Sequence, residues 1–227
     1  MRVHPFLRGL IDSSSIGVGY VPIAISFGLS AVYADLSPLS AVFISVAVYA
    51  GASQFILISL LASGSSAISV VGIVLLMNLR HLFYGPVLVA KLDRRYRRLP
   101  VAVLAAGLTD EVFATSISKM ARQAPQEREA WYAGLQLGAY LAWVSGTAAG
   151  AFFGRDWIAQ SALLAQSLGF VLPALFFALL LEIRQIAPVY VLAGAAAATL
   201  LGLWVLPAYG AIGVGMLAGA LLGGRRA

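Results

Sequence analysis

The sequence contains no cysteine and only two histidines, His4 and His81. The absence of cysteine excludes disulfides and thiolate metal ligands, and two histidines are too few for a histidine-rich metal centre. Charged residues are scarce as well, at 11% of the 227 residues, whereas 61% are hydrophobic. This composition excludes a soluble domain and indicates a polytopic membrane protein, for which we expect no metal and no cofactor.

The net charge of +6 comes from short loops and the two ends of the chain. Lys and Arg at these positions orient membrane helices, so we expect the lipid bilayer as a partner and no nucleic acid. The basic start, the first apolar stretch and Val32-Tyr33-Ala34 together resemble a cleaved signal peptide. That stretch begins late, contains Pro22 and is long enough to span a membrane, which predicts a retained first helix.

Apolar runs separated by charged or Gly/Ser-rich breaks predict an all-α polytopic integral membrane protein in a single transmembrane domain, 1–227. The last run is short and rich in glycine, so seven crossing helices are the alternative to eight. The predicted spans are 14–33, 38–62, 67–90, 99–118, 131–153, 162–181, 187–206 and 208–223.

The orientation of these spans stays open. If all eight cross from a cytoplasmic N-terminus, 8 Lys and Arg residues lie inside and 6 lie outside, which is too even to decide the orientation. Either the N-terminus is external or one early segment turns back without crossing. The second alternative is favoured by Gly51-Ala52-Ser53-Gln54, which interrupts the second span as in broken transporter helices.

A short internal similarity relates residues 19–25 to residues 169–175, five spans apart. An odd offset inverts the second copy, and inverted repeats with broken helices place a substrate site near the membrane midplane. Pro22 and Pro173 are therefore candidate helix breaks, with plain helix bending as the alternative at each. Chance similarity is the alternative to a repeat.

Arg80 lies inside the apolar run 67–90, where a charged side chain costs roughly 2.5–3.5 kcal/mol to insert. Asp110 and Glu111 lie in the middle of the next run, and we predict that the two spans share a buried polar centre. Arg80 either binds a substrate carboxylate or is locked to one of these acids as a structural pair. Asp110 and Glu111 are about 100° apart on a helix, so one can pair while the other titrates, unless both only neutralise Arg80 and His81.

Other polar residues in these runs complete the candidate site. Ser53 and Gln54 offer hydrogen bonds within the second span, where the alternatives are helix packing and substrate contact. Asn78 shares a helix face with His81, and Arg80 shares another with Tyr84. His81 is a candidate proton relay, with a packing role as the alternative. The predicted substrate-binding residues are Ser53, Gln54, Asn78, Arg80 and Tyr84, and the predicted proton-coupling or charge-pairing residues are His81, Asp110 and Glu111.

Three stretches, at 50–55, 78–84 and 108–114, together with 22–28, resemble the AzlC family of branched-chain amino acid exporters. The resemblance implies a multi-pass permease of the bacterial inner membrane that moves leucine, isoleucine or valine, and sometimes methionine, outward using the membrane gradient. It also implies a much smaller membrane subunit of the AzlD type as partner.

A zwitterionic substrate suits the candidate residues. Arg80 or a helix end can hold its carboxylate, and Asp110, Glu111 or the Gln54 carbonyl can hold its ammonium. A channel or assembly subunit is a competing class. An intramembrane enzyme is another, with Ser53 or Ser66 as nucleophile and His81 as base, but no nucleophile motif or metal spacing accompanies them, so we expect no enzyme.

Overall fold

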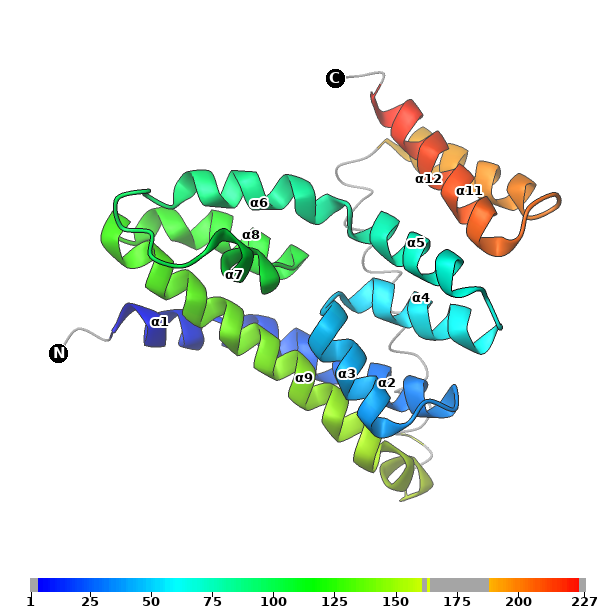
Figure 1. Cartoon of the computed structure of the whole chain (residues 1–227), viewed down its shortest axis with the longest axis horizontal. Coiled ribbons are helices and arrows are strands. Elements are labelled where there is room, and N and C mark those ends of the chain that lie inside the picture. Colours follow the sequence, from blue (N-terminus) through cyan, green and yellow to red (C-terminus); the bar gives the residue numbers. More distant parts are fainter. Residues whose placement is uncertain (1–3, 161–162, 164–187, 225–227) are drawn as a thin grey trace. The chain divides into compact units, whose positions relative to one another are not determined.

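The computed structural model describes residues 4–160, 163 and 188–224, and these residues form helices and turns without a strand (Figure 1). The all-helical prediction is therefore confirmed for the described residues. They cluster into two compact units, one within residues 1–65 and 74–171 and the other within 66–73 and 172–227. The prediction of a single transmembrane domain stays a prediction.

The first unit begins with α1 (Pro5–Asp12) and α2 (Ser14–Tyr33). The His4 side chain caps α1 by accepting a hydrogen bond from the Phe6 backbone N–H. The bounds of α2 are those predicted for the first span. α2 continues through Pro22, so the prediction that the helix breaks there is wrong. Proline removes one backbone hydrogen bond of a helix, and the packing described next holds the helix together across that gap.

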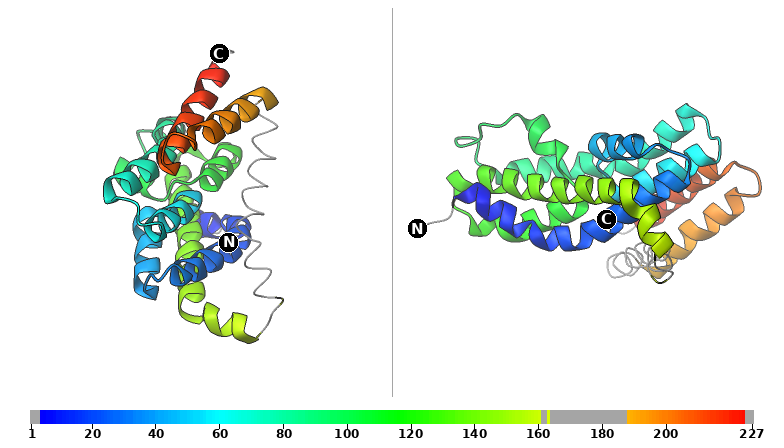
Figure 2. Two further views of the ribbon diagram at one scale, coloured as in Figure 1. Left: turned by 90° about the vertical axis from the view of Figure 1, so that its right-hand side faces the viewer. Right: turned by 90° about the horizontal axis from the view of Figure 1, so that it is seen from below.

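The long helix α9 (Arg128–Gln160) packs along α1 and α2 (Figures 1 and 2). It contains the predicted span 131–153. Glycines bring the two backbones together: a Cβ on Gly28 would overlap the Thr147 carbonyl oxygen, and one on Gly150 would overlap the Ile25 carbonyl oxygen. Such close approach is how membrane helices gain van der Waals contact without a hydrophobic driving force.

The predicted span 38–62 is not one helix but two, α3 (Pro38–Val48) and α4 (Gly51–Ala62). Tyr49, in the left-handed conformation with φ of 43°, ends α3. Tyr49 and Ala50 form the first break, just before the interruption predicted at 51–54. Gln54 Nε2 donates to Ser45 Oγ at 3.0 Å across this break. Because a straight helix would hold these residues about 13 Å apart, α4 must fold back on α3.

The predicted span 67–90 consists of α5 (Ala67–Asn78) and α6 (Arg80–Lys91), separated only at Leu79, the second break. Together they form a 25-residue apolar segment, Ala67–Lys91. By length and mean hydropathy alone, this segment and Ser14–Tyr33 are long and apolar enough to cross a membrane. The count of eight spans therefore stays a prediction.

The predicted span 99–118 is also divided, into α7 (Val101–Ala106) and α8 (Asp110–Lys119). Gly107, Leu108 and Thr109 form the third break. The Thr109 side chain caps α8 by accepting a hydrogen bond from the Val112 N–H at 3.3 Å. Asp110 and Glu111 therefore lie at the start of α8, whereas the sequence analysis predicted them in the middle of one continuous span. Two short 3₁₀ helices, η1 (Met120–Arg122) and η2 (Pro125–Glu127), lead to α9.

In the second unit, α11 (Val189–Gly202) and α12 (Ala208–Gly224) form an antiparallel hairpin. Gly202 lies against Ala211, and Gly194 lies against Leu222. Small residues of the two helices thus pack against each other within the chain. The predicted span 162–181 lies almost wholly outside the described residues, as do Pro173 and the second copy of the repeat.

Candidate functional site

The Arg80 guanidinium and the Asp110 carboxylate form an ion pair, with 3.0 Å between Nη2 and Oδ2. Each is the first residue of its helix, α6 and α8. The positive end of a helix dipole stabilises Asp110 and disfavours Arg80, so the ion pair offsets the cost of placing a cation there. Asp110 is thus the acid that pairs with Arg80.

The pair is only partly engaged. Arg80 Nε and Asp110 Oδ1 are both buried and have no hydrogen-bond partner among the described residues. The side chains as a whole are 40% and 33% exposed, whereas the two unpartnered atoms are themselves covered by protein. One free donor beside one free acceptor matches the carboxylate and the ammonium of an amino acid.

Glu111 has a different partner. The Tyr20 hydroxyl donates to Glu111 Oε2 at 2.6 Å and lies 2.7 Å from Thr109 Oγ1. Tyr20 is only 5% exposed. In the described part of the chain, Glu111 forms no ion pair with a Lys or Arg. The two neighbouring carboxylates are therefore held differently, one by a cation and one by a hydroxyl.

The rings of α6 pack on α8. Tyr84 stacks on Phe113, with 4.3 Å between centroids and 8° between planes. His81 contacts Tyr84 edge-on, at 5.9 Å. This contact supports the packing alternative for His81, and its proton-relay role stays a prediction.

Ser53 and Gln54 are buried in the first turn of α4. Ser53 Oγ donates to Asn78 Oδ1 at 3.2 Å, which joins α4 to the end of α5. Ser45 Oγ, which accepts from the Gln54 amide, lies 2.7 Å from Thr147 Oγ1. Gln54 Oε1 is buried without a hydrogen-bond partner among the described residues. An unpaired buried acceptor is costly, so this oxygen is suited to a hydrogen-bond donor that the described residues do not supply.

These contacts bring the three breaks together. Asn78 and Arg80 flank the second break and contact residues beside the first and the third. Trp143 of α9 also contacts residues beside the breaks. Its indole meets Tyr20 edge-on, with 5.1 Å between ring centroids, and a Cβ on Gly51 would lie 2.9 Å from its Cη2. Tyr20 and Trp143 were not predicted from the sequence. The first span also contains Ser14, Ser15, Ser26 and Ser30, so the tyrosine hydroxyl gave no distinct signal.

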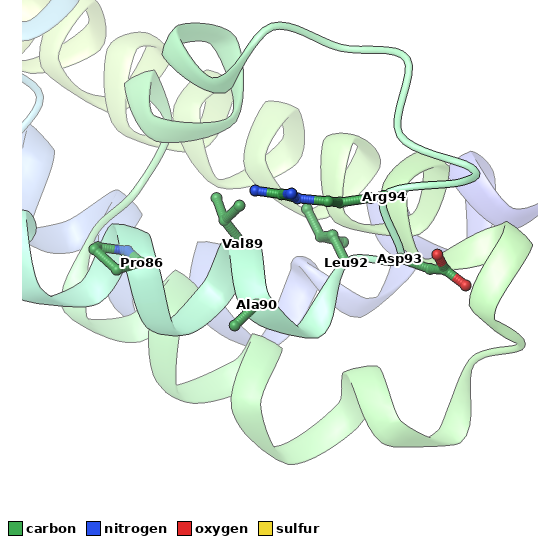
Figure 3. Close-up of a pocket in the computed structure, with 6 residues that line it drawn as sticks. All are labelled: Pro86, Val89, Ala90, Leu92, Asp93 and Arg94. Atoms are coloured by element: carbon green, nitrogen blue, oxygen red, sulfur yellow. The ribbon is translucent and has the colours of Figure 1, made fainter.

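A shallow open pocket lies elsewhere, at the end of α6 (Figure 3). None of its residues is a predicted site residue, and none takes part in the contacts between the breaks. It is lined by Pro86, Val89, Ala90, Leu92, Asp93 and Arg94.

Comparison with known proteins gives one family match, to the model described as AzlC protein, over residues 15–156. The range includes all three breaks. The inner membrane protein YgaZ of Escherichia coli (strain K12) is 41% identical over 180 residues, which are 79% of this chain and 74% of that protein. An uncharacterized membrane protein of Archaeoglobus fulgidus is 39% identical over 176 residues, 78% of this chain and 74% of that protein.

A third relative is the branched-chain amino acid transport protein AzlC of Bacillus subtilis (strain 168). It is 28% identical over 169 residues, which are 74% of this chain and 60% of that protein. No solved structure matches the chain.

Proposed function

Because this chain belongs to the AzlC family of membrane proteins, we propose that it is a secondary transporter that exports branched-chain amino acids across the bacterial inner membrane. The name of the Bacillus subtilis relative supports this substrate class. The observation that carries the proposal is the partly engaged pair of Arg80 and Asp110 at the start of two helices. It offers charge of both signs within an otherwise apolar segment.

The substrates are valine, leucine and isoleucine, with methionine as a further candidate. The carboxylate binds the free Arg80 Nε–H, and the ammonium binds Asp110 Oδ1 or Gln54 Oε1. Apolar and aromatic side chains nearby, Tyr84 and Phe113 among them, suit the branched side chain. Ser53 and Asn78 hold the first and second breaks in register.

Export is driven by the proton gradient, and Glu111 carries the proton. Asp110 is neutralised by Arg80, whereas Glu111 is held by the Tyr20 hydroxyl. A carboxylate that is not committed to a cation can gain and lose a proton during the transport cycle.

The chain acts with a small AzlD-like membrane subunit. Leu82 and Phe83, exposed on α6, suit contact with lipid or with that subunit. We propose no enzymatic activity. Ser53 donates to Ala50 O and Asn78, and His81 packs on Tyr84, and these contacts support packing roles for both residues.

Counterflow of labelled leucine in proteoliposomes, with and without the small subunit, tests the proposal. A carrier gives saturable counterflow that valine and isoleucine compete for, and Arg80→Lys lowers it at least ten-fold because a lysine lacks the bidentate fork. Flux without saturation or competition would indicate a channel instead. No flux in either preparation would contradict the proposal.

A further inference from the structure

α1 and α2 run parallel to α9, so the position of a residue in the first unit can be given along the axis of α9. Gly9 lies against Trp131 at the start of α9, and Gly28 lies against Thr147 and Ala151, in the second half of the helix. Tyr20, between them, contacts Trp143. Any residue that contacts these helices can therefore be assigned a position, or level, along the axis of α9.

The segment α7–α8 begins and ends near the same end of α9, the end that contains Arg128 and Glu129. Its start is fixed by Glu129, which accepts hydrogen bonds from the Arg98 and Leu99 backbone N–H groups. Its break reaches the level of Tyr20, through Thr109 and Glu111. Its end returns to the start of α9, where Lys119 Nζ lies 2.8 Å from the carboxylate of Asp12 and Trp131 donates to the same carboxylate.

The intermediate level of α7 fits this path. Tyr132 and Gln136 of α9 both donate to the Leu104 carbonyl, between the two levels just described. α7 thus runs from the start of α9 towards Tyr20, and α8 runs back to the start of α9.

The segment α3–α4 does the same from the other end. At its break, Tyr49 contacts Tyr140 with 4.8 Å between ring centroids, and Gly51 meets Trp143. Both helices of this segment, α3 and α4, then lie closer to the C-terminal end of α9. Ser45 of α3 bonds Thr147, and Phe55 of α4 contacts Phe27, the neighbour of Gly28.

The two breaks therefore meet near the middle of a membrane-sized distance. From Glu129 to Trp143 the helix rises about 21 Å, and from Trp143 to Gly154 about 16 Å, which together exceed a hydrocarbon core of roughly 30 Å. α3 and α8 are only about 16 and 15 Å long, so neither crosses alone. α9 carries no charged residue between Glu129 and Arg155.

Charge distinguishes the two ends. The basic end is the one where α1, the 92–99 loop and the start of α9 meet, tied by the Arg128 bond to the Lys91 carbonyl. The loops at the opposite end, 34–37 and 63–66, contain no Lys or Arg. The basic end carries Arg8, Lys91, Arg94, Arg95, Arg97, Arg98, Lys119, Arg122 and Arg128.

We infer that α2, α5–α6 and α9 cross the bilayer, whereas α3–α4 and α7–α8 are re-entrant hairpins that enter from opposite sides and meet at the candidate site. The positive-inside tendency places the basic end in the cytoplasm. Irregular backbone at membrane depth is tolerated at the two hairpin tips because Tyr49, Ala50, Leu108 and Thr109 are buried in protein. If the proposed transport function holds, on which this step rests, each hairpin closes the site towards one side of the membrane.

Single cysteines introduced into the naturally cysteine-free chain test this arrangement in cells. Ser37→Cys and Ser63→Cys probe the loops at the ends of the α3–α4 hairpin, and Arg95→Cys and Ala121→Cys probe those of the α7–α8 hairpin. All four positions are exposed. A membrane-impermeant maleimide should label the first pair in cells with a permeabilised outer membrane, and the second pair only after the inner membrane is opened.

The unmodified chain is the control and should remain unlabelled. Five crossings within residues 14–160 instead of three would put the two members of each pair on opposite sides, and that result would overturn the hairpins. Labelling of the Arg95 and Ala121 variants from outside would overturn the orientation. The assay does not require transport: the expected labelling in a chain that shows no leucine counterflow would support the hairpins and contradict the proposed function.

Discussion

Asp110 and Glu111 are adjacent in the chain, yet one carboxylate faces a guanidinium and the other a tyrosine hydroxyl. Glu111→Gln keeps an acceptor for Tyr20 but cannot ionise. We expect labelled leucine to exchange across vesicles at a rate near that of the parent chain, while gradient-driven accumulation falls at least ten-fold. Undiminished accumulation would show that the proton binds elsewhere.

Arg80→Gln leaves the Asp110 carboxylate without its cation. Because both side chains are a third or more exposed, we expect a loss of about 1 kcal/mol, or roughly 2–4 °C in melting temperature in detergent. The double variant Arg80→Gln with Asp110→Asn should regain the melting temperature but not leucine counterflow. Recovery of both would assign the pair a structural role alone.

Asp12 gives a pH-dependent contribution to stability outside the membrane-spanning segments. Burial alone would raise the pKa of Asp12, but hydrogen bonds from Lys119 and Trp131 more than offset it and hold that pKa below its ordinary 3.8. The ionised form therefore stabilises the fold above pH 3.8, and this contribution is lost as the pH falls through the lowered value. Asp12→Asn should melt earlier than the parent near pH 7, with the difference disappearing on acidification. An equal difference at pH 7 and pH 3 would contradict this origin.

Residue types in apolar runs predicted part of the site. Arg80, Asp110 and Glu111 are expensive in lipid, so their mutual attraction could be expected from the sequence. Tyr20 and Trp143 could not, because an aromatic residue in a membrane helix is ordinary. Their importance comes from contacts between residues that are far apart in the chain.

At the scale of helices, the glycine contacts between α2 and α9 set the frame on which the breaks are placed. Gly28→Ala would push a methyl group into the α9 backbone at Thr147, and we expect a loss of about 1–3 kcal/mol. Gly19 of the same helix has open space around it and provides the matched control. Gly19→Ala should be neutral or stabilising by up to about 1 kcal/mol, since alanine favours helix. Equal melting temperatures for the two variants would contradict the close packing.

Hydropathy predicted the bounds of α2 but not the breaks. The helices on the two sides of the first break are similarly apolar, so hydropathy joins α3 to α4. α8 is more polar than α7, but Val112 and Phe113 extend the apolar run across the third break, so hydropathy joins these two helices as well. Thr109-Asp110-Glu111 is a readable helix start, a capping side chain followed by acids. The left-handed Tyr49 is not readable, because tyrosine has no preference for that conformation.

At the scale of the whole molecule, charge sums depend on which segments cross. Eight crossings divide Lys and Arg 8 to 6, because they place the loops 91–98 and 119–128 on opposite sides. In the structure, Arg128 binds the Lys91 carbonyl, so these loops lie at one end. Hydropathy does not report which distant segments contact each other, so the orientation could not be predicted from it.

Substrate protection at the second break tests most directly whether the amino acid binds where the three breaks meet. In the cysteine-free chain, Asn78→Cys should react with a small methanethiosulfonate reagent several-fold more slowly in saturating valine or leucine, whereas Ser63→Cys should react at an unchanged rate. If neither amino acid slows the reaction at position 78 while the variant still performs leucine counterflow, the substrate binds elsewhere in the protein.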